Sequence, residues 1–196
     1  MSARATAQRI EIIEEPLATL AHYGDVRTAF EVSSVFDITR GDGFVLAERA
    51  VTPRYIKDYD AVESEQPANW TSRFDLTNWG VLSANLNGRR VGGAALAFDS
   101  IGAELLEGRE DTAVLWDIRV APDARGHGIG ATLFRAAEQW ARARGCTAME
   151  IETQNNNVPA CKFYAKQGCT LTWINPAAYP DFPDEVQMIW HKLLLK

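Results

Sequence analysis

The chain has 196 residues, of which 46% are hydrophobic and 23% charged, and its formal net charge is −6. This composition is typical of a single globular domain and excludes a disordered chain, and no apolar run is long enough to cross a membrane. The negative charge argues against nucleic-acid binding. The negative charge favours a cationic small molecule or a lysine-rich target as the binding partner. The alternative is that the charge only keeps the protein soluble. Three cysteines without a C-x-x-C pair and the lack of a signal peptide predict a cytoplasmic protein with neither disulfides nor a metal site.

The first third of the chain carries weak patterns. Residues 1–29 have no clear period and predict an N-terminal arm or an irregular helix, so we place a single domain at residues 30–196. Alternation of apolar and polar residues predicts strands at 30–39 and 43–51. The polar segment 52–70 is bracketed by prolines and predicts a loop or a short helix.

The middle of the chain predicts a hairpin and then a longer strand. Asn87-Gly88 supplies the turn between two apolar runs over residues 79–99. The following strand, 112–123, is stopped by Pro122, which cannot donate to a strand partner. Alternation places Val114, Trp116, Ile118 and Val120 on one face and Leu115, Asp117 and Arg119 on the other.

From Ile129 the pattern becomes helical. An apolar stripe extends to Ala141, and Gly145 is a suitable C-terminal cap. Thereafter the chain predicts a strand at 147–154, a short helix at 157–168, and strands at 169–175 and 185–195. A strand, a glycine turn, a helix and a strand in this order predict a right-handed parallel crossover. With hairpins on both sides of the crossover, the expected fold is an α/β or α+β domain with a mixed sheet.

The glycine turn "RGHGIGA" (125–131) places backbone N–H groups at a helix start, which is an arrangement that binds anions. A P-loop is excluded because Ala131 stands where the phosphate-binding lysine is needed. A dinucleotide fingerprint fits in a degenerate form, with Glu150 or Glu152 as the ribose contact. However, more than half of the chain precedes the turn. A plain tight turn into a helix is the remaining alternative.

Two motifs in register carry a family resemblance. Arg125-x-x-Gly128-x-Gly130, between a strand and an amphipathic helix, resembles the acyl-CoA loop of the GNAT N-acetyltransferase superfamily. The segment "NVPACKFYAKQG" (157–168) has the Asn, Ala, Tyr and Gly spacing of the next helix in that superfamily. The longer segment "IETQNNNVPACKFYAKQGC" (151–169) is most similar to the streptothricin acetyltransferases. The resemblance implies a mixed, largely antiparallel sheet with a central, splayed parallel strand pair flanked by helices.

The resemblance also implies a donor substrate, acetyl-CoA, and a direct transfer of the acetyl group to an amine. In that family, Tyr164 is the general acid that protonates the leaving thiolate. Among the loop residues, His127 is expected to contribute only its backbone N–H. The residues expected to contact acetyl-CoA are Ile118, Val120, Arg125, Gly126, His127, Gly128, Ile129, Gly130, Ala131, Asn157, Ala160 and Tyr164.

The amine must lose a proton, and two strand carboxylates are candidates for the base. Asp117 is ranked narrowly ahead of Glu152, and either could instead be a solvated strand residue. Both, together with Asp58 and Asp60, are expected to contact a cationic substrate, which the resemblance implies is streptothricin, acetylated on its β-lysine moiety. Cys161 is expected to be inert because no neighbouring residue in the sequence suggests a base.

Two further functions remain open at this point. The same fold suits an N-acetyltransferase of proteins, peptides or polyamines, and it also suits a non-catalytic module that binds acyl-CoA. Retention of Tyr164 argues against the second. By analogy with the superfamily, a homodimer is an option, with the strand 185–195 as a candidate contact. No nucleic acid, membrane or metal is expected as a partner.

Overall fold

The structure is a computed structural model and describes residues 9–106 and 108–194. The α-helices are α1 (Leu20–Tyr23), α2 (Ile129–Ala143) and α3 (Val158–Lys166). The strands are β1 (Ile10–Glu15), β2 (Phe30–Arg40), β3 (Phe44–Lys57), β4 (Gly80–Leu86), β5 (Arg89–Ala97), β6 (Thr112–Val120), β7 (Ala148–Gln154), β8 (Thr170–Asn175) and β9 (Gln187–Leu193). Short 3-10 helices occupy Leu17–Thr19, Tyr59–Ala61, Glu63–Glu65, Pro67–Ser72, Glu104–Leu106 and Pro122–Ala124.

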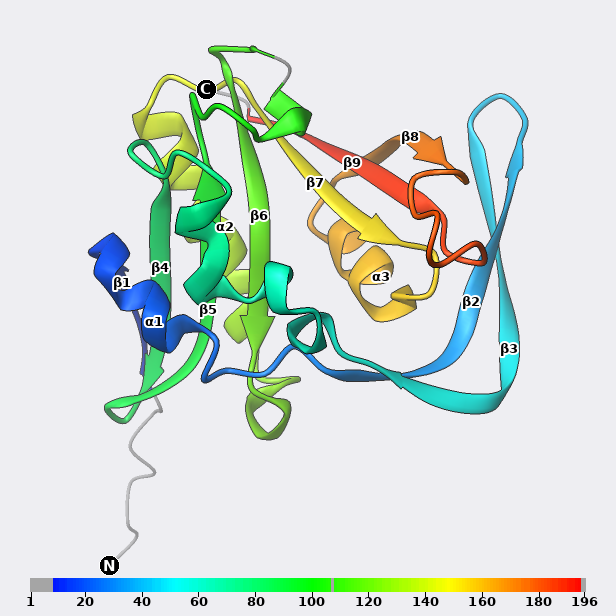
Figure 1. The fold of residues 1–196 in the computed structure, drawn as a ribbon, viewed down its shortest axis with the longest axis horizontal. Coiled ribbons are helices and arrows are strands. Elements are labelled where there is room, and N and C mark those ends of the chain that lie inside the picture. Colours follow the sequence, from blue (N-terminus) through cyan, green and yellow to red (C-terminus); the bar gives the residue numbers. More distant parts are fainter. Residues whose placement is uncertain (1–8, 107, 195–196) are drawn as a thin grey trace, which may run out of the picture.

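Seven strands form the main sheet, in the order β1-β4-β5-β6-β7-β9-β8. Its pairs are antiparallel except β6 and β7, which are parallel, as the crossover predicted. The parallel pairing covers only Thr112–Leu115 and Ala148–Ile151, after which the two strands separate (Figure 1). The mixed, largely antiparallel sheet with a splayed parallel pair is therefore confirmed. Because the strands separate, the backbone groups on the facing edges of β6 and β7 do not pair with each other beyond Leu115 and Ile151.

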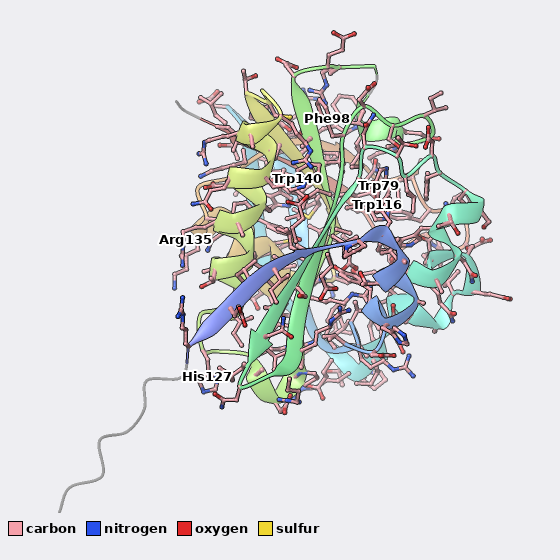
Figure 2. The ribbon with its side chains drawn as sticks, turned by 90° about the vertical axis from the view of Figure 1, so that its left-hand side faces the viewer. Trp79, Phe98, Trp116, His127, Arg135 and Trp140 are labelled. Carbon is pink, nitrogen blue, oxygen red and sulfur yellow. The ribbon has the colours of Figure 1, made fainter. Side chains whose placement is uncertain are left out.

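Apolar layers cover both faces of the sheet. Helix α2 packs on one face, and its predicted stripe, which includes Ile129, Leu133 and Trp140, is buried against the strands. On the other face, α1 and the 3-10 segment Pro67–Ser72 cover an aromatic cluster that includes Trp79 and has Trp116 packed against it. Figure 2 shows Trp140 between α2 and the sheet, with Trp79 and Trp116 on the opposite side and Arg135 directed to solvent.

Strands β2 and β3 pair with each other and, among the residues that the structure describes, with no strand of the main sheet. Figure 1 shows them as a long ribbon beside the ends of β7, β8 and β9. The ribbon is attached at the tip of β7, where Phe36 donates its N–H to the carbonyl of Asn155 (2.9 Å). Residues 52–57, for which the sequence predicts a loop or a short helix, continue β3, and residues 55–57 pair with residues 30–32 of β2. The pattern conceals this because most side chains of this part of the ribbon are exposed.

The N-terminal segment is a second correction. An arm or an irregular helix is wrong for residues 10–15, which form the edge strand β1 and pair antiparallel with β4. Ile10 and Ile12 turn inward, but two apolar positions are too few to establish a period. Residues 1–8, the rest of the predicted arm before β1, lie outside the described part of the chain.

The alternation along β6 is interrupted. Ala95 of β5 pairs with Asp117, but the next residue, Leu96, pairs with Leu115, so Trp116 is left over as in a β-bulge. The bulge reverses which face later residues occupy. Trp116 packs in the cluster opposite α2, whereas Ile118 packs in the core beneath α2. The predicted single face of Val114, Trp116, Ile118 and Val120 is therefore wrong.

The local turn predictions are confirmed. Asn87 (φ 52°) and Gly88 (φ 77°) form the β4–β5 turn, and Gly145 (φ 81°) ends α2. In that end, the N–H of Cys146 reaches back to the carbonyl of Ala141 (3.1 Å). No helix in the described ranges is long and apolar enough to span a membrane.

Candidate active site

The glycine turn presents a row of unused backbone donors. Gly126 (φ 81°) and Gly128 (φ 79°) adopt left-handed conformations, and Gly128 caps the start of α2. The first helical bond in this region is from Thr132 to Gly128 (3.0 Å). Within residues 9–106 and 108–194, the N–H groups of 126–131 donate to no partner. Because these donors join the positive end of the α2 dipole, the turn is suited to an anion such as a pyrophosphate.

The two charged or titratable side chains of the turn are directed elsewhere. Arg125 donates from Nε to the carbonyl of Val120 (2.9 Å) and from Nη2 to that of Ala29 (3.4 Å). His127 approaches only the carbonyl of Ala124 (3.4 Å) and lies at the N-terminal end of α2 in Figure 2. Arg125 therefore ties the turn to the end of β6, and the anion site consists of main chain.

We expect Gly128→Ala to weaken acetyl-CoA binding. An alanine at φ 79° costs about 1–2 kcal/mol of strain, and relief of that strain would reorient the N–H groups of the turn, since the methyl group itself would meet open space. We expect the KM for acetyl-CoA to rise about tenfold, since 1.4 kcal/mol corresponds to a factor of ten. Gly145→Ala is the matched control, because Gly145 has φ 81° and is equally open but lies beyond the opposite end of α2. An equal KM in both variants would contradict this assignment.

The open edge of β6 offers further main-chain groups. Ala121 donates its N–H to Val91 of β5 (2.8 Å), and the N–H direction alternates along a strand. Ile118 and Val120 therefore direct their N–H groups away from β5, toward the splay. This is the orientation that the predicted contact of these two residues with the pantetheine requires.

Tyr164 lies at the back of the splay. Its ring packs between Phe163 (5.5 Å between centroids) and Trp190 (6.4 Å), and the residue is 6% exposed. Burial raises the pKa of Tyr164 well above its usual value, and the charge of Asp117 raises it further, so the hydroxyl keeps its proton at neutral pH. That hydroxyl makes no hydrogen bond to any residue in the described ranges. The hydroxyl of Tyr164 is a proton donor that has no acceptor in the described part of the chain, and its oxygen is not fully buried.

Asn157 and Ala160, both predicted to contact the cofactor, are joined as a helix cap. Asn157 accepts the N–H of Ala160 (3.2 Å) at the start of α3, which accounts for their three-residue spacing. The amide nitrogen of Asn157 donates to the hydroxyl of Tyr59 (3.4 Å). The cap thereby orients α3, and with it Tyr164.

Asp117, the first-ranked candidate base, belongs to a buried ion network. Its two oxygens accept Nε and Nη2 of Arg119 (2.8 Å each), and one also accepts the hydroxyl of Tyr23 (2.7 Å). Nη1 of Arg119 reaches the carbonyl of Val26 (3.0 Å) and the carboxylate of Asp60 (3.2 Å). Burial alone would lower the pKa of Arg119, but the two carboxylates raise it above its usual value. The charge of Asp117 is therefore already neutralised by a permanent counterion.

The acidic residues Asp58 and Asp60, in the segment before β4, also form hydrogen bonds and ion pairs within the protein. Asp60 is 5% exposed, and besides Arg119 it accepts the N–H (3.3 Å) and hydroxyl (3.1 Å) of Thr28. Asp58 caps the following 3-10 helix by accepting the N–H of Asp60 (3.1 Å). In this structure Asp60 thus anchors the chain between β3 and β4 to β6, and Asp58 supports the turn that carries Asp60.

Replacement of Arg119 should destabilise the protein strongly. In Arg119→Met, two largely buried carboxylates lose their counterion, and breaking a buried pair in this way costs about 3–5 kcal/mol. At 2–4 °C per kcal/mol, we expect the melting temperature to fall by about 10 °C. Arg54→Met removes an exposed ion pair with Glu31 and is the control, with an expected change below about 1 kcal/mol. Equal melting temperatures for the two variants would contradict this account.

Glu152, the second candidate base, has a different environment. One oxygen accepts the hydroxyl of Tyr179 (2.6 Å) and the other accepts the amide of Gln187 (2.9 Å). Both donors are neutral, so this carboxylate keeps its negative charge available to a cation. Burial raises the pKa of Tyr179 well above its usual value, and the charge of Glu152 raises it further. Glu152 therefore fits the role of base better than Asp117 does.

A chain of hydrogen bonds extends from Glu152 into the splay. Gln154 donates to the hydroxyl of Tyr179 (2.9 Å) and accepts that of Tyr59. Burial raises the pKa of Tyr59, although the hydrogen bond from Asn157 opposes the shift. Sequence reasoning missed both tyrosines because their partners lie 95 and 25–27 residues away. The only local signals were an aromatic residue within each of two acidic loops.

A buried ion pair closes the same region. Lys57, at the end of β3, bonds to Glu185 (2.6 Å), and the two side chains are 16% and 12% exposed. The Lys57 ammonium also lies 4.2 Å from the ring centre of Phe182. These contacts attach the β8–β9 loop to the β2–β3 ribbon, and the same loop carries Tyr179.

Cys161 lacks the ionised thiol that a nucleophile needs. Cys161 is 1% exposed, and burial raises the pKa of its thiol to about 12, so a thiolate is absent at neutral pH. In the described ranges, no group of three or more His, Cys, Asp or Glu side chains could hold a metal ion.

Cys161→Ala should therefore retain activity. Because the thiol is protonated and buried, we expect kcat to stay within about twofold of wild type. We also expect no labelled enzyme after incubation with radioactive acetyl-CoA alone. A loss of activity by two orders of magnitude in a folded variant, together with labelling of the wild type, would instead establish an acetyl-cysteine.

Comparisons with known proteins agree with this geometry. Residues 46–169 match the model of the acetyltransferase (GNAT) family. The streptothricin acetyltransferase of Escherichia coli is 33% identical over 189 residues, covering 93% of this chain and 94% of the relative. That of Streptomyces lavendulae is 29% identical over 152 residues, covering 77% and 76%.

Two solved structures share the fold. One is nourseothricin acetyltransferase, with a TM-score of 0.74, 24% identity and coverage of 95% of this chain and 99% of the other. The second is a proposed streptothricin acetyltransferase of Bacillus anthracis in complex with acetyl coenzyme A, with a TM-score of 0.75, 24% identity and coverage of 96% and 99%. On the family match and the full-length similarity, the chain belongs to the GNAT family of N-acetyltransferases, which use acetyl-CoA as the acetyl donor.

Proposed function

We propose that this protein acetylates an amine of a cationic antibiotic of the streptothricin class, on its β-lysine moiety, by direct transfer from acetyl-CoA in a ternary complex. The observation that carries the substrate class is the 33% identity to a streptothricin acetyltransferase along nearly the whole of both chains. The expected consequence in a cell is resistance by modification of the antibiotic.

The donor side of the site uses main-chain groups. The free N–H groups of residues 126–131 bind the pyrophosphate, and those of Ile118 and Val120 bind the pantetheine and polarise the thioester carbonyl. When bound, acetyl-CoA supplies an activated acetyl group on a thiol leaving group. Because fixed backbone dipoles need no reorganisation, they stabilise the negative charge that develops on the carbonyl oxygen.

The acceptor side uses Glu152. Its carboxylate attracts the protonated amine, accepts one proton from it, and so frees the nitrogen lone pair for attack on the acetyl carbon. Tyr179 and Gln187 position both oxygens of Glu152 through neutral hydrogen bonds. Asp117, neutralised by Arg119, contributes to the stability of β6.

Tyr164 completes the proton balance. As the C–N bond forms and the C–S bond breaks, the sulfur gains an electron pair, and the Tyr164 hydroxyl donates its proton to it. The nitrogen, which is positively charged after the attack, loses its second proton, and by way of solvent this proton replaces the one that Tyr164 gives up. The proton on Glu152 is released to solvent, so each acetyl transfer releases one proton. The absence of a competing acceptor for the Tyr164 hydroxyl in the described residues supports this role.

The test is thiol release from acetyl-CoA with a panel of amines. We expect turnover with streptothricin that exceeds turnover with lysine, polyamines, aminoglycosides and lysine peptides by at least about tenfold in kcat/KM. Faster turnover of peptides or polyamines would keep the chemistry and overturn the substrate class. Tight acetyl-CoA binding without turnover of any amine would favour a non-catalytic acyl-CoA-binding module.

A further inference from the structure

A cavity lies between the β2–β3 ribbon and the β8–β9 loop, near the residues proposed for acetyl transfer. Its volume is about 690 Å³, which is within the range of small-molecule pockets. Much of its wall is apolar, including Phe36, Val51, Ile174 and Val186. Asp184 lies at its exposed rim, and the Asp37–Arg49 ion pair also lines it, so the lining carries two negative charges and one positive charge.

Two residues of the cavity lining, Asn156 and Tyr55, form a polar pair that is incompletely bonded. Asn156 is 2% exposed, and its Nδ2 donates to the hydroxyl oxygen of Tyr55 (3.3 Å). Its Oδ1 is buried and has no partner in the described residues, and the Tyr55 hydroxyl proton has no acceptor there. One free acceptor and one free donor thus lie side by side. If the oxygen and nitrogen of the Asn156 amide were exchanged, the Tyr55 hydroxyl would donate to the amide oxygen. The amide N–H would then be the free donor and the hydroxyl oxygen the free acceptor.

The pair is close to the acetyl-transfer site along two segments of chain. Asn156 follows Gln154 by two residues, a separation of at most about 7 Å between Cα atoms. Tyr55 precedes Tyr59 by four residues on the other wall, and Tyr59 is bonded to Gln154. One extended molecule can therefore reach both places.

We propose that this cavity is a subsite for the non-reacting part of the amine substrate. There, Asn156 and Tyr55 bind a group with an N–H donor beside a C=O acceptor, such as an amide, a carbamate or a lactam. The apolar wall covers the ring or chain that carries this group. The subsite rests on the proposed function, because the amine of the same molecule must reach Glu152.

The first test compares a long and a short acceptor. The variant Tyr55→Phe removes one hydroxyl, and Tyr55 is 42% exposed, so the variant should fold. We expect the ratio of kcat/KM for streptothricin to kcat/KM for free β-lysine to fall about fivefold. Val51→Trp, which fills the cavity, should lower this ratio further. Ile56→Ala is the control, because Ile56 is next in the chain, 66% exposed and outside the cavity, and it should leave the ratio unchanged. An unchanged ratio in Tyr55→Phe and Val51→Trp would overturn the subsite while leaving the acetylation of streptothricin intact.

The second test does not depend on turnover. We would titrate the protein with δ-valerolactam and with methyl carbamate and follow the side-chain amide signals of Asn156 by NMR. We expect these signals to shift in the wild type and in Ile56→Ala, with a smaller shift in Tyr55→Phe. Shifts without acetylation of streptothricin would leave the subsite standing and refute the proposed substrate. The absence of any shift among the residues that line the cavity would refute the subsite.

Discussion

Tyr164→Phe should lower kcat by about 100-fold or more, with little change in the KM for acetyl-CoA. The hydroxyl has no partner among the described residues, so its removal takes away a proton donor and no structural bond. For the same reason, the melting temperature should be unchanged or slightly higher, because an unpaired hydroxyl contributes nothing to stability. The measurements are steady-state kinetics and thermal unfolding of the two proteins.

A change of leaving group separates acid catalysis from a packing effect. An acetyl thioester of a more acidic thiol needs less protonation as the C–S bond breaks, so the deficit of Tyr164→Phe should shrink with it. An equal deficit with both donors would show that Tyr164 only shapes the pocket. Tyr23→Phe is a control, because its hydroxyl donates to Asp117 and is placed outside the proton path.

Glu152→Gln should lower kcat/KM by about 100-fold or more. Glutamine has nearly the same shape and can still accept the hydroxyl of Tyr179 through its carbonyl oxygen, but it cannot take a proton from the amine. It also removes the negative charge that attracts the substrate, so the KM for the amine should rise. Both effects are measured by varying the amine at saturating acetyl-CoA.

Two variants make this prediction specific. Glu150→Gln is the matched control, because Glu150 lies two residues earlier on β7 and bonds to Arg109 (3.2 Å) and His191 (3.1 Å). Asp117→Asn tests the other candidate base and should reduce stability more than it reduces kcat. Full activity in Glu152→Gln with an inactive, folded Asp117→Asn would reverse the assignment.

The local features of the site could be predicted from the sequence. The glycine turn, the stripe of α2 and the turn at Asn87-Gly88 each depend on residues within a few positions of one another. Such patterns set periodicity and backbone conformation, which neighbouring residues largely decide. The parallel crossover followed from the order of these elements, and the splay from the family resemblance.

The features that could not be predicted arise from contacts across the chain. Asp60 meets Arg119 across 59 positions, and no local pattern marks that a residue in a polar segment will be buried in an ion pair. The bulge at Trp116 reverses the face of later residues, and alternation alone cannot locate it. Tyr179 is recruited to Glu152 only because the β8–β9 loop folds back over the end of β7.

The most direct test of the account is an initial-rate matrix in which streptothricin and acetyl-CoA are varied together. Direct transfer in a ternary complex predicts double-reciprocal lines that intersect, with a rate that depends on both Glu152 and Tyr164. Parallel lines would indicate an acetylated enzyme intermediate and would contradict direct attack. The open splay between β6 and β7 and the buried, protonated thiol of Cys161 are the observations that support direct attack.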